Sequence, residues 1–374
     1  MTAKLQELAR MAPGPAPVVS VYLDTRWSDE HQRERVRVFL KNETHKAAAM
    51  AAGQLEAELD WITRQGERLV TQELDPEHAG TAMFAGGAAG LRETLRLAVP
   101  FPDTFVVADV PQLRPLVTAL GEAPRAALLF VDGESARLVA LTEHGAGEDI
   151  TLEATDAVGH HRRGGWLLLL QSRYQRHIHV HRARHFDAVA HALAGLVHEY
   201  GLRAIVLAGE ARNLAVFRTH VPSPLDRHIV GEVSGARYEP TSALAERALG
   251  VLRHQAAGHV AGTLDALLAE AAGRGRAAAG VDATVDAVNR GTVDRLYLLA
   301  GYDGVGAVCV SCHALHSAVT GTCRWCGAAT RSVGLGETMV QRVLAAGGDV
   351  ASVDIHAGLD RAGGAAARLR YAAA

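Results

Sequence analysis

Short apolar runs alternate with longer amphipathic stretches along the whole chain. The apolar runs predict strands at Val18–Asp24, around Thr81–Phe84, on both sides of Asp132-Gly133, and at Ala204–Gly209, Arg295–Gly301 and Val350–His356. The amphipathic stretches predict helices at about Glu34–Gln72, up to about His198, from about Thr241, at Asp282–Asn289 and at about Glu337–Ala346. Because strands and helices alternate from end to end, we expect an α/β fold class.

The order of these elements predicts three α/β domains. A chain of 374 residues is long enough to form about two to three separate cores. Five prolines between positions 100 and 124 mark the approach to the second domain. We place the domains at residues 1–122, 123–262 and 263–374.

The composition is that of an ordinary globular protein. The chain is 48% hydrophobic and 21% charged, and its formal net charge is -3. No window holds the roughly 18 consecutive apolar residues of a membrane-spanning helix, and the N-terminus has no apolar signal region. We therefore expect a cytoplasmic protein without membrane contact.

All four cysteines fall in two CxxC pairs, Cys309 with Cys312 and Cys323 with Cys326, ten residues apart. Each CxxC turn can present two thiolates to one ion, and four thiolates satisfy the tetrahedral geometry that zinc prefers. Two disulfides or four free thiols are the alternatives, and a reducing compartment disfavours the disulfides. We predict a structural zinc knuckle at about residues 307–330, because closed coordination leaves no position for a substrate.

The segment from His160 to His185 is strongly basic. It holds six Arg and six His but no Asp or Glu. Leu170, Tyr174 and Ile178 recur every four residues, which predicts a helix with one buried stripe and cationic groups on its other faces. Concentrated positive charge attracts phosphates, so we predict RNA contacts here. The candidate residues are His160, His161, Arg162, Arg163, Trp166, Arg173, Arg176, His177 and Arg184.

Two other interpretations of this segment stay open. Gly164-Gly165 can be an ordinary turn, with Trp166 beginning a buried helix. On a strand, His177, His179 and His181 would share one face and could bind a metal ion, although no neighbouring carboxylate supports such a site. The motifs of P-loop nucleotide hydrolases, HExxH proteases and α/β-hydrolases do not occur in the sequence.

The order of several pieces resembles the archaeal and eukaryotic class-one peptide release factors and their relative Pelota, within the group of bacterial homologues that includes Balon-like ribosome-binding factors. The pieces are LLFVDGESARLVAL, HHRRGGW, AIVLAGEARNL, GVDATVDAVNRGTVDRLYL and the terminal GGAAARLRY. They are distributed over the run from Ala127 to Tyr371. The resemblance implies an RNase H-like middle domain and an L7Ae-like C-terminal domain with an inserted zinc ribbon.

In those release factors a loop reads Gly-Gly-Gln, and the matching positions here are Gly164, Gly165 and Trp166. Two glycines let the backbone enter a crowded catalytic centre, and the Gln side chain helps to hold the water that attacks the peptidyl-tRNA ester. An indole has one N–H donor and no acceptor, so Trp166 cannot copy that water contact, although it can stack on a nucleobase. The Asn-Ile-Lys-Ser motif that reads stop codons is also missing from the sequence.

The resemblance thus implies a translation factor that occupies the ribosomal A site, in hibernation or rescue, without efficient peptide release. Its implied partners are the rRNA of the A site and of the peptidyl-transferase centre, with tRNA and a delivering translational GTPase as further candidates. The alternative is an enzyme that uses the altered loop to hydrolyse peptidyl-tRNA or to cleave tRNA. An RNA-binding stress protein that does not use the ribosome is a third interpretation.

Overall fold

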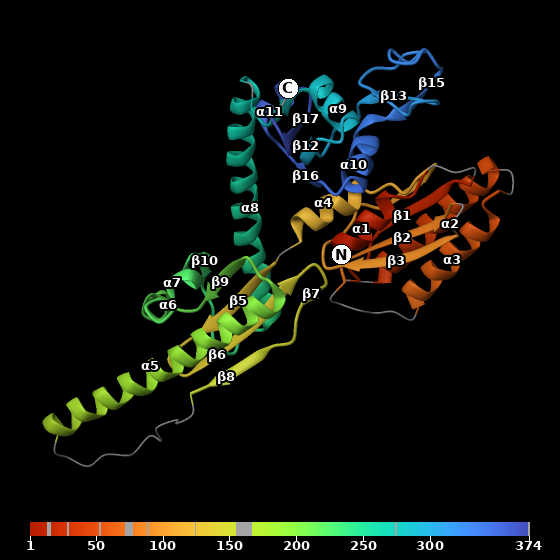
Figure 1. The fold of residues 1–374 in the computed structure, drawn as a ribbon. Coiled ribbons are helices and arrows are strands. Elements are labelled where there is room, and N and C mark those ends of the chain that lie inside the picture. The colour runs from red at the N-terminus through yellow and green to blue at the C-terminus, as the bar shows by residue number, and fades with distance from the viewer. Residues whose placement is uncertain are drawn as a thin grey trace. The chain divides into compact units, whose positions relative to one another are not determined.

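A computed structural model of the chain (Figure 1) contains two compact units. The first unit combines residues 1–122 with residues 258–374, and the second consists of residues 123–257. The predicted first and third domains therefore contribute to one unit, and the division into three domains stays a prediction. The structure describes the whole chain except residues 13–15, 28–29, 52–53, 72–77, 88–89, 124, 155–166, 274 and 373–374.

A four-stranded antiparallel sheet forms the N-terminal part of the first unit. Its strands, in the spatial order β3-β2-β1-β4, are Leu91–Leu97, Gly80–Gly86, Val18–Asp24 and Thr104–Ala108. Two helices, α2 (Glu30–Ala51) and α3 (Glu56–Thr71), cover one face of the sheet and pack on Val19 and Val21. Tyr22 belongs to the opposite face, where the centroid of its ring lies 5.0 Å from the ring centroid of Phe101. Because β1 is buried on both faces, its sequence is almost continuously apolar.

A second four-stranded sheet forms the C-terminal part of this unit. Its strands, in the order β11-β17-β12-β16, are Ala277–Ala279, Ala365–Leu369, Val293–Leu299 and Asp349–Val353. Its helices are α9 (Val281–Asn289), α10 (Leu335–Ala345) and α11 (Ala357–Arg361). Between β12 and α10 the chain forms a separate small sheet of three strands, β14-β13-β15, which are Leu315–His316, Val305–Cys309 and Thr330–Gly334.

Two helices join these sheets within the first unit. Helix α1 (Thr2–Ala9) contacts α10, and α4 (Arg114–Glu122) contacts β16 and α10. Leu8 of α1 and Leu116 of α4 are fully buried. The apolar faces of α1 and α4 therefore help to form a core that the two ends of the chain share.

The second unit contains a mixed sheet with helices on both faces. Its strands, in the order β10-β9-β5-β6-β7 with β8 also paired to β6, are Ile229–Val233, Ala204–Ala208, Ala126–Val131, Ser135–Thr142, Gly145–Ala146 and Ile150–Glu153. Strands β5, β9 and β10 run parallel. One face packs on α5 (Leu167–Tyr200), α6 (Ala211–Arg218) and α7 (Ser223–Asp226). The other face packs on the first turns of α8 (Thr241–Ala271), through Leu244 and Ala248.

The predicted α/β fold class is confirmed, as is the hairpin that turns at Asp132-Gly133. The segment that carries His177 and His181 is helical, so the strand interpretation with three aligned imidazoles is wrong. The helical region expected over Glu34–Gln72 is two helices, and α1, α4 and the edge strands β3 and β4 were not predicted. Within the described residues, no helix combines the length and apolar character needed to cross a lipid bilayer.

Candidate functional site

The four cysteines meet at one end of the small three-stranded sheet. Cys309 is the last residue of β13, and Cys323 and Cys326 lie between β14 and β15. The antiparallel pairing of β13 with β15 brings the two CxxC turns together. The Sγ atom of Cys309 lies 3.5 Å from that of Cys326, and the Sγ atom of Cys312 lies 3.6 Å from that of Cys323.

These separations suit four thiolates around one metal ion. Four sulfurs bound tetrahedrally at about 2.3 Å would lie about 3.8 Å apart. In the described part of the chain, no other group of His, Cys, Asp or Glu side chains gathers three or more ligand atoms in this way. Cys309 and Cys323 are buried, whereas Cys312 and Cys326 are exposed. The four cysteines that the sequence predicts as metal ligands therefore lie close together, and their Sγ atoms are near enough to share one ion.

Backbone N–H groups favour the thiolate form of the buried cysteines. The N–H groups of Cys312 and Ser311 each donate to the Sγ atom of Cys309 at 3.4 Å, and they lower the pKa of this thiol to about 6. Burial raises the pKa of the Cys323 thiol, but hydrogen bonds from the backbone of Cys326 and Trp325 outweigh it, so the pKa is lowered. Both effects favour metal binding, because a metal ion binds thiolates and not thiols.

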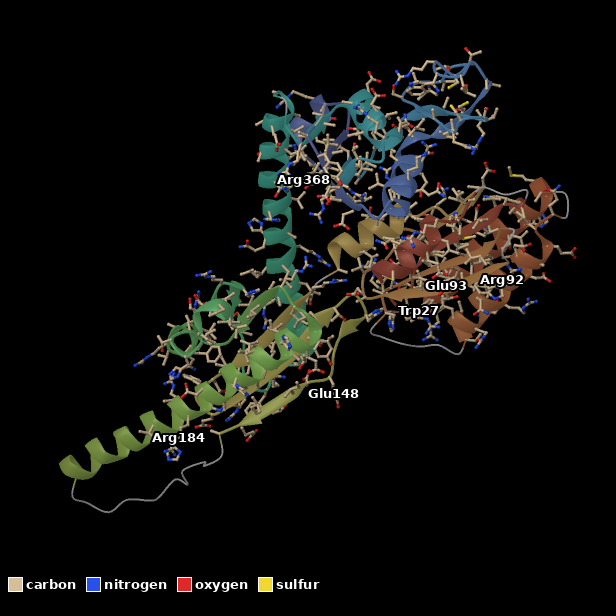
Figure 2. All side chains as sticks on the ribbon, in the orientation of Figure 1. Trp27, Arg92, Glu93, Glu148, Arg184 and Arg368 are labelled. Atoms are coloured by element: carbon tan, nitrogen blue, oxygen red, sulfur yellow. The ribbon has the colours of Figure 1, made fainter. Side chains whose placement is uncertain are left out.

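Most of the predicted RNA-binding residues lie outside the residues whose positions the structure describes. These are His160, His161, Arg162, Arg163 and Trp166, and the loop candidates Gly164 and Gly165 also lie outside the described residues. Arg173, Arg176 and His177 lie on α5, but their side chains also belong to the undescribed part. Arg184 is described and is exposed on α5 (Figure 2), where its guanidinium is accessible to a phosphate.

Arg182 and His185 of this basic segment face the protein. The guanidinium of Arg182 donates to Asn213 Oδ1 at 2.8 Å and lies 5.1 Å from the centroid of the Phe186 ring. His185 is buried, and burial lowers the pKa of its imidazole although its hydrogen bond with the Ser135 backbone opposes this. The basic segment therefore divides into residues that anchor α5 on the sheet and residues, such as Arg184, that face outward.

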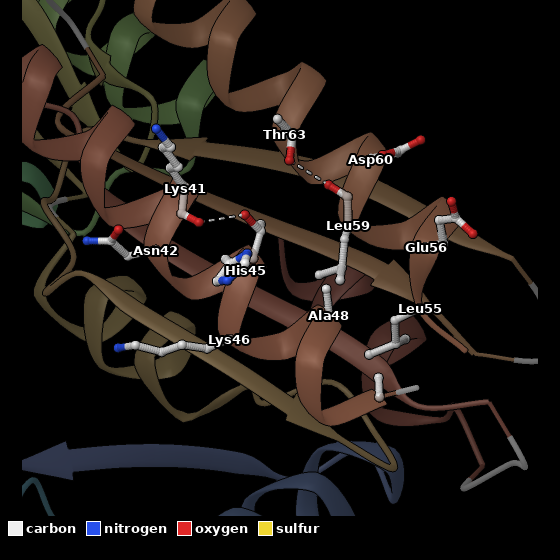
Figure 3. Close-up of a pocket in the computed structure, with 12 residues that line it drawn as sticks. Lys41, Asn42, His45, Lys46, Ala48, Leu55, Glu56, Leu59, Asp60 and Thr63 are labelled. Atoms are coloured by element: carbon white, nitrogen blue, oxygen red, sulfur yellow. Dashed lines mark hydrogen bonds between the residues drawn. The ribbon is translucent and has the colours of Figure 1, made fainter. Parts of the chain in front are cut away.

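Sequence reasoning did not identify a groove between α2 and α3, with a cavity volume of about 810 Å³ (Figure 3). Lys41 and Lys46 line its α2 side, Glu56 and Asp60 line its α3 side, and Ala48 contributes to the wall. The small side chains Ala48 and Ala51 of α2 leave such a groove unfilled, and they are the signal that could have revealed it. Since its two sides carry opposite charge, the groove does not suit a polyanion.

Solved structures of several translation factors are similar to this chain, at low sequence identity. An archaeal termination factor, aRF1, is 16% identical over 99% of this chain and 97% of its own, with a TM-score of 0.26. Archaeal Pelota, from a model described as ribosome-bound Pelota and ABCE1, is 12% identical over 100% of this chain and 95% of its own, with a TM-score of 0.43. Dom34 from S. cerevisiae is 11% identical over 79% of both chains, with a TM-score of 0.41. No curated protein matches the chain.

A family match covers most of the second unit and the residues just before it. Residues 111–253 match the family described as bacterial archaeo-eukaryotic release factor family 10. The matched range contains the parallel strands β5 and β9, helix α5 and the sequence positions of Gly164, Gly165 and Trp166. The resemblance found in the sequence is therefore confirmed, and residues 111–253 of this chain are similar to the family of bacterial archaeo-eukaryotic release factors.

Proposed function

We propose that this protein is a ribosome-associated translation factor of the release-factor and Pelota type, which occupies the A site in hibernation or rescue without efficient peptide release. The observation that carries the proposal is the family match over residues 111–253, a range that includes the Gly-Gly loop. The absence of any Asp or Glu between His160 and His185 supports contact with rRNA phosphates at this loop.

The N-terminus of helix α5 favours binding of an anionic partner next to the loop. The helix begins at Leu167, directly after Trp166 in the chain. The first backbone N–H groups of a helix have no partner within the helix, and its dipole is positive at this end, so both favour a phosphate. The sequence thus places Arg162, Arg163 and a helix N-terminus within a few residues of one another.

Trp166 is the reason for proposing occupancy instead of peptide release. Hydrolysis of the peptidyl-tRNA ester needs a positioned water and donors for the developing oxyanion. The backbone N–H at position 166 can supply a donor, but the indole has no acceptor to hold the water. The indole can stack on an unpaired rRNA base, which would hold the factor in place.

A peptidyl-tRNA hydrolase is the second candidate function. The feature that favours it is the retained Gly164-Gly165 pair, together with the backbone N–H of the next residue. In this case the attacking water would be held by a group other than the side chain at position 166.

Ribosome binding is tested by co-sedimentation of the purified protein with vacant ribosomes. We expect binding at low salt that is lost at about 0.5 M salt, because phosphate contacts release counterions. Replacing both Arg162 and Arg163 with Ala should weaken binding, whereas the control Arg253→Ala, an exposed arginine of α8, should not. Absence of ribosome affinity at low salt would contradict the proposal.

Peptide release separates the two functions. Ribosomes that carry a labelled peptidyl-tRNA are mixed with wild-type protein or with the Trp166→Gln variant. The binding proposal predicts no peptide release by the wild type. Release by the Gln variant would show that the side chain at position 166 decides whether the peptide is released. Release by the wild type at a rate above that of water alone would favour the hydrolase.

The finer partner and cofactor assignments belong to the same proposal. The four-thiol cluster is assigned to structural zinc, since all four ligands are protein sulfurs and none of the tetrahedral positions is left for substrate. A delivering GTPase is a further candidate partner; the yeast relative Dom34 is described as interacting with Hbs1. Addition of a translational GTPase with GTP to the co-sedimentation assay tests it, through an increase in the rate of binding.

A further inference from the structure

The second CxxC turn of the cysteine knuckle presents an aromatic side chain to solvent. Trp325 lies between Cys323 and Cys326, so the coordination of these two thiolates would fix its backbone. Its side chain is 51% exposed, although an indole gains much from burial. The ring centroid of the buried His316 lies 4.9 Å from that of Trp325, which supports the indole from the side of the protein.

A cation is held against this indole. The guanidinium carbon of Arg324 lies 4.1 Å from the centroid of the Trp325 ring. The Nη2 atom of Arg324 donates to Asp286 Oδ1 at 2.6 Å, so the guanidinium is anchored from α9 while its side chain stays 57% exposed. Arg324 therefore stacks on one face of the Trp325 indole, and the positions of the two planar groups are set before any ligand arrives.

The planar groups of the surrounding segment favour a nucleic acid, and its two arginines are paired with Asp286 and Asp109. Between Gly304 and Gly336 the chain contains two Arg and two His but no Asp or Glu. Indole rings and guanidinium planes are the groups on which unpaired RNA bases stack. A duplex keeps its bases stacked inside the helix, so a duplex cannot offer them to this surface.

We infer that Arg324 and Trp325 form a second RNA-binding site, which stacks an unpaired base of single-stranded RNA on the cysteine knuckle. The site is distant in sequence from the Gly-Gly loop and does not require that the loop enter the peptidyl-transferase centre. It gives the C-terminal part of the chain a role in RNA recognition that is independent of the proposed A-site occupancy.

The test measures binding of a fluorescently labelled single-stranded oligouridine to the full-length, metal-loaded protein by anisotropy. The background carries Arg162→Ala and Arg163→Ala, so that contacts of the basic segment do not mask the knuckle. Trp325→Ala should weaken binding about tenfold, and Trp325→Phe, which keeps a stacking ring, should stay within about threefold. Val319→Ala removes another exposed apolar side chain of the knuckle, and it should leave the affinity unchanged.

Metal content is measured for each variant, because loss of the knuckle fold would also abolish binding. If Trp325→Ala releases the metal, a photo-crosslink of 4-thiouridine RNA to the wild-type protein replaces the affinity measurement. Crosslinks in the peptide that contains Arg324 and Trp325 support the site, and crosslinks confined to other peptides overturn it. Unchanged RNA affinity in a metal-loaded Trp325→Ala variant would also overturn the proposal. It would be overturned in the same way if that variant kept its RNA affinity but lost binding to a protein partner.

Discussion

The carboxylate of Glu337 accepts a hydrogen bond from the backbone N–H of Arg114 at 3.2 Å, although the two residues are 223 positions apart. The same carboxylate accepts the N–H of Leu113 at 2.5 Å. The guanidinium of Arg114 in turn donates to the carbonyl oxygens of Leu299 and Ala300, at 2.8 and 2.5 Å. A side chain from α10 thus caps the start of α4, and a side chain from α4 satisfies the end of β12, all within the first unit.

Replacement of Glu337 with Ala should therefore destabilise the first unit. Two backbone N–H groups in a partly buried site would lose their acceptor, which costs about 1–3 kcal/mol of unfolding free energy. Urea denaturation followed by circular dichroism measures this change. The control Glu56→Ala, at an exposed position of α3, should change the free energy by less than about 0.5 kcal/mol. Equal stability of the two variants would show that the cap does not contribute.

The stability contributed by Glu337 should depend on pH. Burial raises the pKa of its carboxyl above the usual 4.5, although the N–H groups of Leu113 and Arg114 and the Arg114 charge oppose this. The folded protein therefore holds this proton more tightly than the unfolded chain. The stability linked to the proton is fully present below pH 4.5 and is lost as the pH rises through the raised pKa. Relative to Glu337→Gln, the wild type should lose unfolding free energy between pH 4.5 and neutral pH; parallel denaturation curves for the two proteins would contradict this.

Gly209 and Gly195 should respond in opposite directions to replacement by Ala. Gly209 directly follows β9 and has a φ of +151°, and a Cβ atom there would lie 2.7 Å from the carbonyl oxygen of Val131. Since backbone cannot easily give way, Gly209→Ala should cost more than about 2 kcal/mol. Gly195 lies exposed on α5 with open space around it, so Gly195→Ala should stabilise by roughly 0.5–1 kcal/mol. Thermal unfolding of both variants measures whether Gly209→Ala lowers the stability and Gly195→Ala raises it.

Metal binding should depend on Cys323 and not on the side chain of Ser311, a residue of the knuckle that supplies no thiol. We expect about one zinc ion per wild-type chain, and loss of this ion in Cys323→Ser, because three sulfurs and one weaker hydroxyl oxygen cannot close the site. Elemental analysis after dialysis measures the content. Ser311→Ala is a matched control: its backbone N–H, which donates to Cys309, is retained, so the ion should stay bound. Equal metal content in the Cys323→Ser variant would remove the four-thiol assignment.

Local pattern was sufficient for much of the fold. The apolar runs at Val18–Asp24 and Ala204–Gly209 lie at strands β1 and β9, and the Asp132-Gly133 turn separates β5 from β6. These elements are read correctly because strand pairing and tight turns impose a pattern on adjacent residues. The strand β3, LRETLRL, was not predicted because this edge strand is partly exposed and more than half of its residues are charged or polar.

The sequence by itself determined the α/β character, the release-factor resemblance and the pairing of four cysteines in two CxxC turns. Tertiary structure decided which cationic residues of the basic segment remain available to bind a phosphate. Arg182 is held by Asn213, whereas Arg184 is exposed. Tertiary structure also decided that Glu337 caps α4 and that Asp286 anchors Arg324 beside Trp325. The physical reason is the range of the interaction. Turns, helices and CxxC pairs are set by residues a few positions apart, but a buried carboxylate finds its partner only when distant segments pack together.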